Sequence, residues 1–313
     1  MSLSKYLFLA KVLAWDTEIT LLNMVTPSKK VGHVIPEGHP GAGGKWPEFI
    51  PPKEGDSRCS CPAINAMANH GVLPRDGKNI SFKELGAKVH TTYNFAETFC
   101  YFVPNFAAKM LGRDYETGTF DLKDLDLHNG IEHDASLTRE DVVHEPDQTK
   151  PHVPFIKELL DGATGKDSDG NPLLTIEDIS KYSTKRRVEA RETNPEFTLE
   201  STHKIIGSTN ASNFAAVFGG CIDDLSTFLI EERFPDGWEP KLYEANGLSI
   251  LSYYRNTISK VENGIDEDKF RRDREERKNQ RHDEEEGGEV LPAGGNTSSG
   301  GAVGATGELR RRV

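Results

Sequence analysis

Apolar residues along most of this chain recur every three or four positions, which is the spacing of one face of an α-helix. The pattern begins at the N-terminus, where one helical face would hold Leu3, Tyr6, Leu7, Ala10, Leu13 and Ala14. We therefore expect residues 1–26 to form an amphipathic helix. Such a helix would pack on the protein core or associate weakly with a membrane surface.

Local sequence signals predict further helices. Pro62 is suited to the first turn of a short helix that ends at Asn69. Ser81 with Glu84 forms a capping box that starts a long helix, which Pro104 would kink or end. More helices are expected over residues 175–192, 223–233 and 247–261. No stretch alternates apolar and polar residues for long enough to predict a sheet, so the expected fold class is mainly α.

The last part of the chain has a different composition. Residues 266–286 are almost all charged, and the residues after them are rich in Gly, Ser and Thr. Pairs such as Glu275 with Lys278 could extend the last helix, whereas the end has too little apolar surface to fold. We expect an N-terminal helix over 1–26, one helical domain over 27–264, and a charged and then disordered tail over 265–313.

Composition excludes several classes of protein. The 313 residues carry a net charge of −12, which argues against nucleic-acid binding, and no apolar run is long enough to span a bilayer. Four cysteines are too few for a disulfide scaffold, and Cys59 with Cys61 does not form a C-x-x-C motif. No clean signal peptide is present because Lys11 interrupts the apolar stretch, so an intracellular location is expected, with secretion as the alternative.

Cys61 is followed by Pro62 at the start of a predicted helix. The backbone N–H groups of a helix N-terminus favour a thiolate and would lower the pKa of the Cys61 thiol. Small residues at Ala63 and Ala66 would let a flat ring system lie close to this helix. Taken alone, the motif favours a buried structural cysteine before an ordinary first-turn proline.

A second cluster of polar residues lies within residues 128–141. Glu132 and Ser136 are four positions apart, so on a helix their oxygens would share a face and could hold Mg²⁺ with water. His128 and His133 lie nearby, but no cysteine is close enough to suggest a structural zinc site. The alternative is a solvated acidic helix start.

The two segments together resemble the fungal haem-thiolate peroxidases, the chloroperoxidase and unspecific peroxygenase family. SCPAINAMANHG (60–71) is similar to the haem-ligating motif of that family, and EHDAS (132–136) to its second signature, in the same order. RRVEARETNPEF (186–197) extends the resemblance more weakly. The resemblance implies a single chloroperoxidase-like helical domain that binds haem b.

The resemblance also implies roles for individual residues. Cys61 would be the axial thiolate ligand of the haem iron, although Ser60 replaces the first proline of the usual Pro-Cys-Pro. Glu132, the backbone carbonyl of His133 and the hydroxyl of Ser136 would bind Mg²⁺. The His133 side chain would support a distal catalytic glutamate. A thiolate ligand favours cleavage of the peroxide O–O bond.

The distal glutamate of the family is missing from the matching part of this chain. Asn210 lies near the expected position, and no carboxylate occurs between Glu200 and Asp223. An amide cannot transfer a proton in general acid–base catalysis. Three explanations follow: His133 acts as the base, Glu200 or Asp223 with Asp224 reaches the site, or the protein performs other haem chemistry.

The predicted function is therefore the oxidation or oxygenation of small organic molecules with hydrogen peroxide. A haloperoxidase of the same family is one alternative. A non-catalytic protein that binds or senses haem is the other, and the missing glutamate favours it. The oligomeric state is not predicted.

Overall fold

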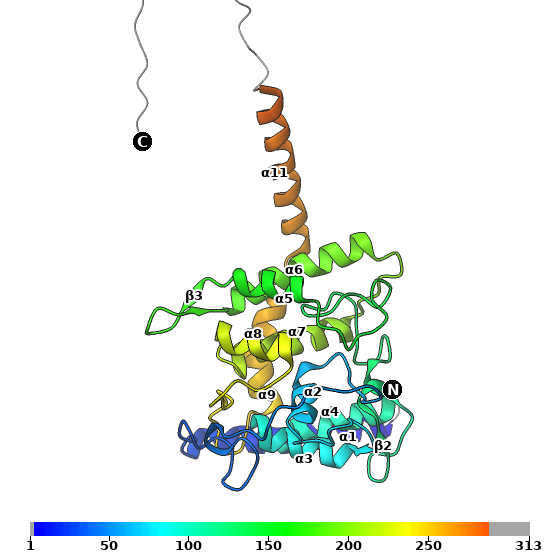
Figure 1. Cartoon of the computed structure of the whole chain (residues 1–313), viewed down its shortest axis with the longest axis vertical. Helices are drawn as coiled ribbons and strands as arrows, with labels where there is room; N and C mark the ends of the chain where they lie inside the picture. The colour runs from blue at the N-terminus through cyan, green and yellow to red at the C-terminus, as the bar shows by residue number, and fades with distance from the viewer. Residues whose placement is uncertain (1–2, 288–313) are drawn as a thin grey trace, which may run out of the picture. The chain divides into compact units, whose positions relative to one another are not determined.

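The computed structural model describes residues 3–287, and its secondary structure is mainly helical (Figure 1). The helices are α1 (Leu3–Val25), α2 (Pro62–Asn69), α3 (Phe82–Tyr93), α4 (Glu97–Met110), α5 (Val153–Asp161), α6 (Ile176–Thr193), α7 (Ser201–Ala216), α8 (Ile222–Glu231), α9 (Ile250–Tyr253), α10 (Ser259–Asn263) and α11 (Glu267–Gly287). Short helical turns occupy Ala42–Gly44, Leu122–Asp126 and Tyr254–Ile258. The mainly α prediction is confirmed.

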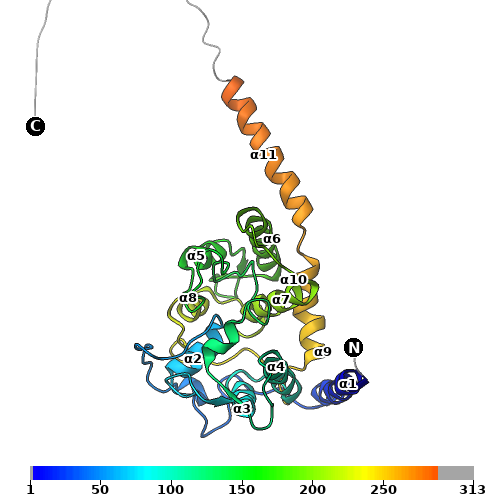
Figure 2. The same cartoon turned by 90° about the vertical axis from the view of Figure 1, so that its right-hand side faces the viewer.

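The strands are only two residues long and form two separate antiparallel pairs. β1 (Ile80–Ser81) pairs with β2 (Thr119–Phe120), and β3 (Gly165–Lys166) pairs with β4 (Pro172–Leu173). Figures 1 and 2 show α1, α3 and α4 together on one side of the helical domain, with α5 and α6 on the opposite side. Helices α2, α7 and α8 lie between these two groups.

Two helices replace the single long helix that was expected after Ser81. The Ser81 hydroxyl accepts a hydrogen bond from Glu84 N, as predicted, but α3 ends at Asn94. Asn94 adopts φ 58°, a left-handed conformation that asparagine tolerates better than most residues. Its side-chain amide donates to the carbonyl of Leu242 at 2.8 Å, so a contact far away in sequence stabilises the break.

Pro104 lies inside α4, which continues to Met110, so the expectation that it ends a helix is wrong. A proline cannot donate to the carbonyl four residues before it, which here is Cys100. The freed carbonyl faces Gly86 of α3, where an added Cβ would stand 2.4 Å from the Cys100 oxygen. Pro104 leaves the Cys100 carbonyl without its helical hydrogen bond, and Gly86 has no side chain. Together these two features let α3 and α4 pack closely.

The central core next to α2 is aromatic. Trp46 stacks on Phe234 with ring centroids 3.9 Å apart, and Phe234 stacks on Trp238 at 5.5 Å. His70, one residue beyond the end of α2, donates through Nδ1 to the carbonyl of Pro47 and accepts through Nε2 from Phe234 N. These contacts fix the orientation of α2 and therefore the position of Cys61.

The segment after Gly264 forms a separate helix. Residues 271–313 separate from residues 1–270 as a second structural unit. Residues 267–287 of the predicted tail form α11, in agreement with the expectation that the charged part is helical. The predicted disorder of residues 288–313 lies outside the described residues, and the boundaries at 26/27 and 264/265 stay predictions.

Candidate functional site

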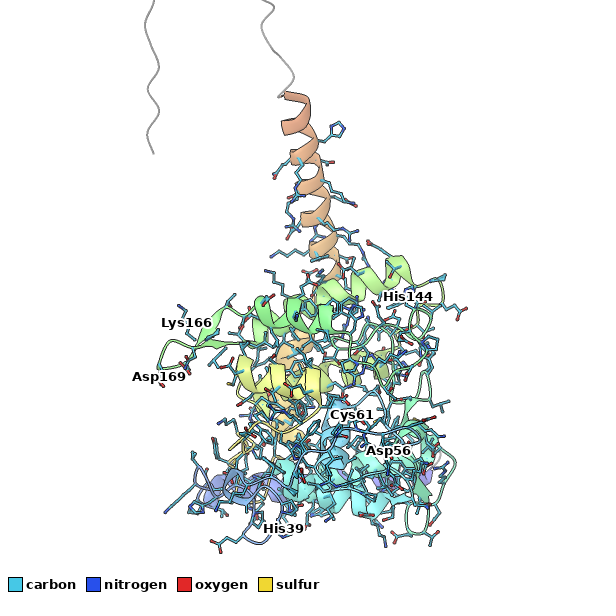
Figure 3. The ribbon with its side chains drawn as sticks, viewed as in Figure 1. His39, Asp56, Cys61, His144, Lys166 and Asp169 are labelled. Carbon is cyan, nitrogen blue, oxygen red and sulfur yellow. The ribbon has the colours of Figure 1, made fainter. Side chains whose placement is uncertain are left out.

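Cys61 stands at the N-terminal end of α2, where Figure 3 labels it, and its thiol forms no disulfide. Pro62 occupies the first helical position, as predicted. Cys61 is exposed, whereas the next cysteine along the chain toward the N-terminus, Cys59, is fully buried. An unpaired, accessible sulfur at a helix N-terminus is suited to binding a soft metal centre such as haem iron.

The pKa of the Cys61 thiol is raised, not lowered as the helix position suggested. The cause is that the surrounding protein removes much of the water that would solvate a thiolate, although the side chain is open on one side. The N–H groups of Ile64 and Ala63 act in the predicted direction but do not form a full capping hydrogen bond. Desolvation outweighs these N–H groups, so a cationic partner such as a metal is needed to favour the thiolate.

Ser60 has a structural function that a proline could not perform. Its backbone N–H donates to Asp126 Oδ1 at 2.7 Å. Proline has no such donor. The departure from the Pro-Cys-Pro pattern therefore exchanges a rigid ring for a hydrogen bond to the segment that leads into residues 128–141.

A buried polar network holds the Cys61 segment against two distant elements. Asn65 of α2 accepts from Cys59 N and donates to Glu232 Oε2 at 2.9 Å. Glu232 follows the end of α8, and its Oε1 accepts from Arg139 Nη2 at 2.5 Å. Arg139 is 1% exposed, so this ion pair lies in the interior. Sequence reasoning missed all three residues, because nothing local marks partners that are 93 or 167 positions apart.

The EHDAS segment is a loop, so the expectation that Glu132 and Ser136 share a helical face is wrong. Ala135 has φ 62°, which breaks any helix, and its N–H donates to Asp141 Oδ1 at 2.8 Å. Glu132 is buried rather than solvated. Burial raises the pKa of its carboxyl group, while a 2.7 Å hydrogen bond from His128 acts against that rise.

His133 is buried, and its ring is held by the neighbouring backbone. Its Nδ1 lies 2.7 Å from the carbonyl oxygen of Asp134, which can only accept, so Nδ1 carries the proton. Nε2 is then the basic nitrogen of a neutral imidazole. Burial lowers the pKa of His133, which favours the same neutral form.

Helix α7 packs against the His133 ring at Gly207, where no side chain separates the two. A Cβ added to Gly207 would stand 3.0 Å from Cε1 and 3.3 Å from Nε2 of His133, closer than most side chains allow. One turn before Gly207, His203 Nε2 lies 3.1 Å from the carbonyl of Asn129. The sequence motifs did not predict α7, since its apolar residues show no clear helical periodicity.

The weaker motif, residues 186–197, also reaches this loop. Asn194 donates to Asp141 Oδ2 at 2.9 Å, and Thr198 N donates to Asp134 Oδ2 at 2.8 Å. Arg186 Nε donates to the carbonyl of Ser136 at 3.1 Å. The second and third motifs are therefore one connected structure.

Among the other candidates for a distal acid, Glu200 and Asp223 are exposed and Asp224 is partly buried. Asn210, which lies near the position expected for the family's glutamate, is exposed. Within residues 3–287, no carboxylate side chain hydrogen-bonds to the His133 ring. The same part of the chain contains no group of three or more His, Cys, Asp or Glu side chains able to hold a metal. A Mg²⁺ ion would therefore need the His133 carbonyl and the Ser136 hydroxyl beside Glu132.

Comparison with known proteins agrees with the arrangement of these motifs. Residues 47–242 match the family described as Peroxidase, family 2. The chain is 24% identical to the dothistromin biosynthesis peroxidase of Dothistroma septosporum over 226 residues, which are 60% of this chain and 53% of that protein. It is 31% identical to the chloroperoxidase of Leptoxyphium fumago over 115 residues, 33% of this chain and 30% of that protein.

A third relative is the aromatic peroxygenase of Coprinellus radians, 27% identical over 193 residues, or 52% of this chain and 71% of that protein. The chain spans about half the length of the dothistromin biosynthesis peroxidase. The matched region includes Cys61, the EHDAS loop and α7, which are the parts that the hydrogen bonds above bring together.

Proposed function

Because this chain belongs to Peroxidase, family 2, we propose that it is a haem-thiolate enzyme that uses hydrogen peroxide to oxidise or oxygenate small organic molecules. The observation that carries the proposal is the free, exposed thiol of Cys61 at the N-terminus of α2. One relative is named a chloroperoxidase, which supports a halide substrate. Another is named an aromatic peroxygenase, which supports an organic substrate. We favour organic substrates, with haloperoxidase activity as the alternative.

Cys61 is the residue that we propose to bind the iron of haem b. A thiolate-ligated haem supplies the chemistry that cleaves the peroxide O–O bond. Burial raises the pKa of the free Cys61 thiol, so a bound iron cation would be needed to favour the thiolate form there. Asn65 and the Arg139–Glu232 pair hold the segment that positions the sulfur.

Glu132, the carbonyl of His133 and the hydroxyl of Ser136 are the proposed ligands of Mg²⁺. The supporting feature is a buried carboxylate in a loop whose turn at Ala135 is fixed by Asp141. Oxygen donors are the ligands that Mg²⁺ prefers, with water completing the octahedron. The single carboxylate would give modest affinity in the absence of haem.

His133 is the proposed catalytic base. Its Nε2 is free to accept a proton, since Nδ1 donates to the carbonyl of Asp134. The backbone contact and Gly207 keep the ring in one orientation. None of Glu200, Asp223 and Asp224 hydrogen-bonds to the His133 ring within the described residues, so we favour His133 over these carboxylates.

Replacing the base tests this assignment. We expect His133→Ala to slow the reaction with peroxide by about 100-fold or more, the usual size of a general acid–base contribution. His144→Ala removes an exposed imidazole from the following turn and should leave the rate unchanged. Stopped-flow mixing of the haem-loaded proteins with hydrogen peroxide gives both rates. If His133→Ala reacts like the wild type while Cys61 still binds haem, the assignment is wrong.

The proposed function itself is tested with peroxide and an aromatic substrate. The haem-loaded wild type should form oxidised or hydroxylated product over many turnovers, detected by mass spectrometry. Bleaching of the haem without product would instead favour a haem-binding or sensing protein. Chlorinated product in the presence of chloride would identify the haloperoxidase alternative.

A further inference from the structure

Helix α1 is fixed to the protein along one face. Val12, Asp16 and Ile19 are buried on this face. The Asp16 carboxylate accepts hydrogen bonds from Ile250 N at 2.9 Å and Leu251 N at 2.8 Å, and so caps the N-terminus of α9. It also accepts from the Thr98 hydroxyl of α4. The rotation of α1 about its own axis is therefore determined.

Most of the large side chains on the open part of the α1 surface are apolar. The large apolar side chains of α1 that are exposed are Tyr6, Leu7, Leu9, Leu13, Leu21, Leu22, Met24 and Val25. Their exposed fractions run from 43% at Leu9 to 80% at Val25. Helix α9 packs against α1 and adds two exposed apolar side chains, Leu251 within it and Tyr254 just after it. Among the α1 side chains described, the exposed charges are those of Lys11 and Glu18.

The protein covers the face of α1 that contains Asp16. At about 100° per residue, the exposed apolar side chains from Leu9 round to Val25 span about 160° of the helix circumference. The exposed Lys11 and Glu18 lie at one edge of this arc, between Val25 and Leu22. Something other than the rest of this chain's described residues is therefore expected to cover the apolar arc.

The width of the exposed surface indicates what that partner is. A second helix, such as α1 of another copy, covers a narrow seam of positions spaced three and four apart. It would leave much of the apolar surface in water. A lipid bilayer can enclose the whole exposed arc, since acyl chains adapt to its shape. Interfacial helices usually need a polar face toward water, and here the protein itself occupies that side.

We propose that α1, with Leu251 and Tyr254, is a docking surface that lies in the interfacial layer of a lipid bilayer, parallel to its plane. Within residues 3–287, no helix has the length and apolar content to cross a membrane, which is consistent with α1 lying on it. The hydroxyl groups of Tyr6 and Tyr254 suit the headgroup level.

Charge determines which lipids the surface fits. The chain carries a net charge of −12, and among the α1 side chains from Tyr6 onward the exposed Lys11 and Glu18 have opposite charges. Apolar burial rather than attraction to anionic headgroups therefore drives the contact, and neutral phosphatidylcholine suffices. This inference does not depend on the proposed enzymatic function.

Flotation of the full-length, haem-loaded protein with phosphatidylcholine vesicles tests the inference. The wild type should rise with the vesicles, and raising the salt concentration should not release it. Leu13→Glu combined with Leu21→Glu places two charges on the exposed face and should reduce the bound fraction at least tenfold. Ile50→Glu adds a charge at an exposed apolar residue outside α1 and should bind like the wild type.

Two controls accompany the flotation experiment. Circular dichroism melting should show that the double variant folds. If the double variant does not fold, Met24→Glu in the last turn of α1 takes its place and should also reduce binding. Light scattering without lipid reports the oligomeric state. A wild type that stays in solution with vesicles, or a lipid-independent dimer that the double variant abolishes, would overturn the proposal.

Discussion

Cys61→Ser is expected to abolish product formation from hydrogen peroxide. Loss of residues that only support a metal ligand typically costs 10–100-fold, so loss of the ligand itself should cost at least about 100-fold in activity. A serine hydroxyl is a much poorer donor to haem iron than a thiolate, and it cannot push electron density toward the bound peroxide. The variant should fold normally, because Cys61 forms no disulfide and serine differs from cysteine by one atom.

A matched control exists in Cys221. It is also a free cysteine one residue before a helix, at the N-terminal end of α8, and it is partly exposed. Cys221→Ser should therefore retain wild-type activity and haem content. Equal losses in both variants would mean that the effect of Cys61→Ser is a general consequence of replacing a helix-capping cysteine.

Breaking the buried Arg139–Glu232 ion pair should have the largest effect on stability. Burial raises the pKa of Glu232, and Arg139 acts most strongly against that rise. Arg139→Met leaves the carboxylate without its cation in the interior, which typically costs about 3–5 kcal/mol of unfolding free energy. In a domain of this size the melting midpoint should fall by roughly 6–20 °C.

An exposed pair provides the comparison for that measurement. Lys150 lies 3.1 Å from Glu145, and its side chain is 58% exposed. Lys150→Met should change the unfolding free energy by less than about 1 kcal/mol. Adding Glu232→Leu to Arg139→Met should recover part of the loss, because no unpaired charge remains. A change of under about 1 kcal/mol for Arg139→Met alone would contradict the role of the network.

The residues of the proposed site can be found from sequence more readily than their arrangement. Cys61-Pro62 and the EHDAS segment are short motifs, so they can be recognised without the fold. The spacing of Glu132 and Ser136 predicts a helix, whereas residues 128–141 form a loop. Its actual course depends on Asp141 and Asn194, which the spacing does not reveal.

Long-range contacts account for most of what the sequence did not predict. Asn65, Arg139 and Glu232 form one network only after the chain has folded, and each alone resembles an ordinary surface polar residue. The break between α3 and α4 depends on contacts from Asn94 to Leu242. The helical state of α1 was predicted correctly. The face expected to pack on the core, which includes Tyr6, Leu7 and Leu13, is exposed instead, and the packing of the opposite face required the structure.

The central claim is that the Cys61 thiolate binds haem iron, and the spectrum of the reduced carbon monoxide complex tests it most directly. If Cys61 binds the iron, the wild type should show a strongly red-shifted Soret band, the mark of thiolate ligation opposite carbon monoxide. A Soret band at the ordinary position of histidine-ligated haem would show that Cys61 is not the ligand.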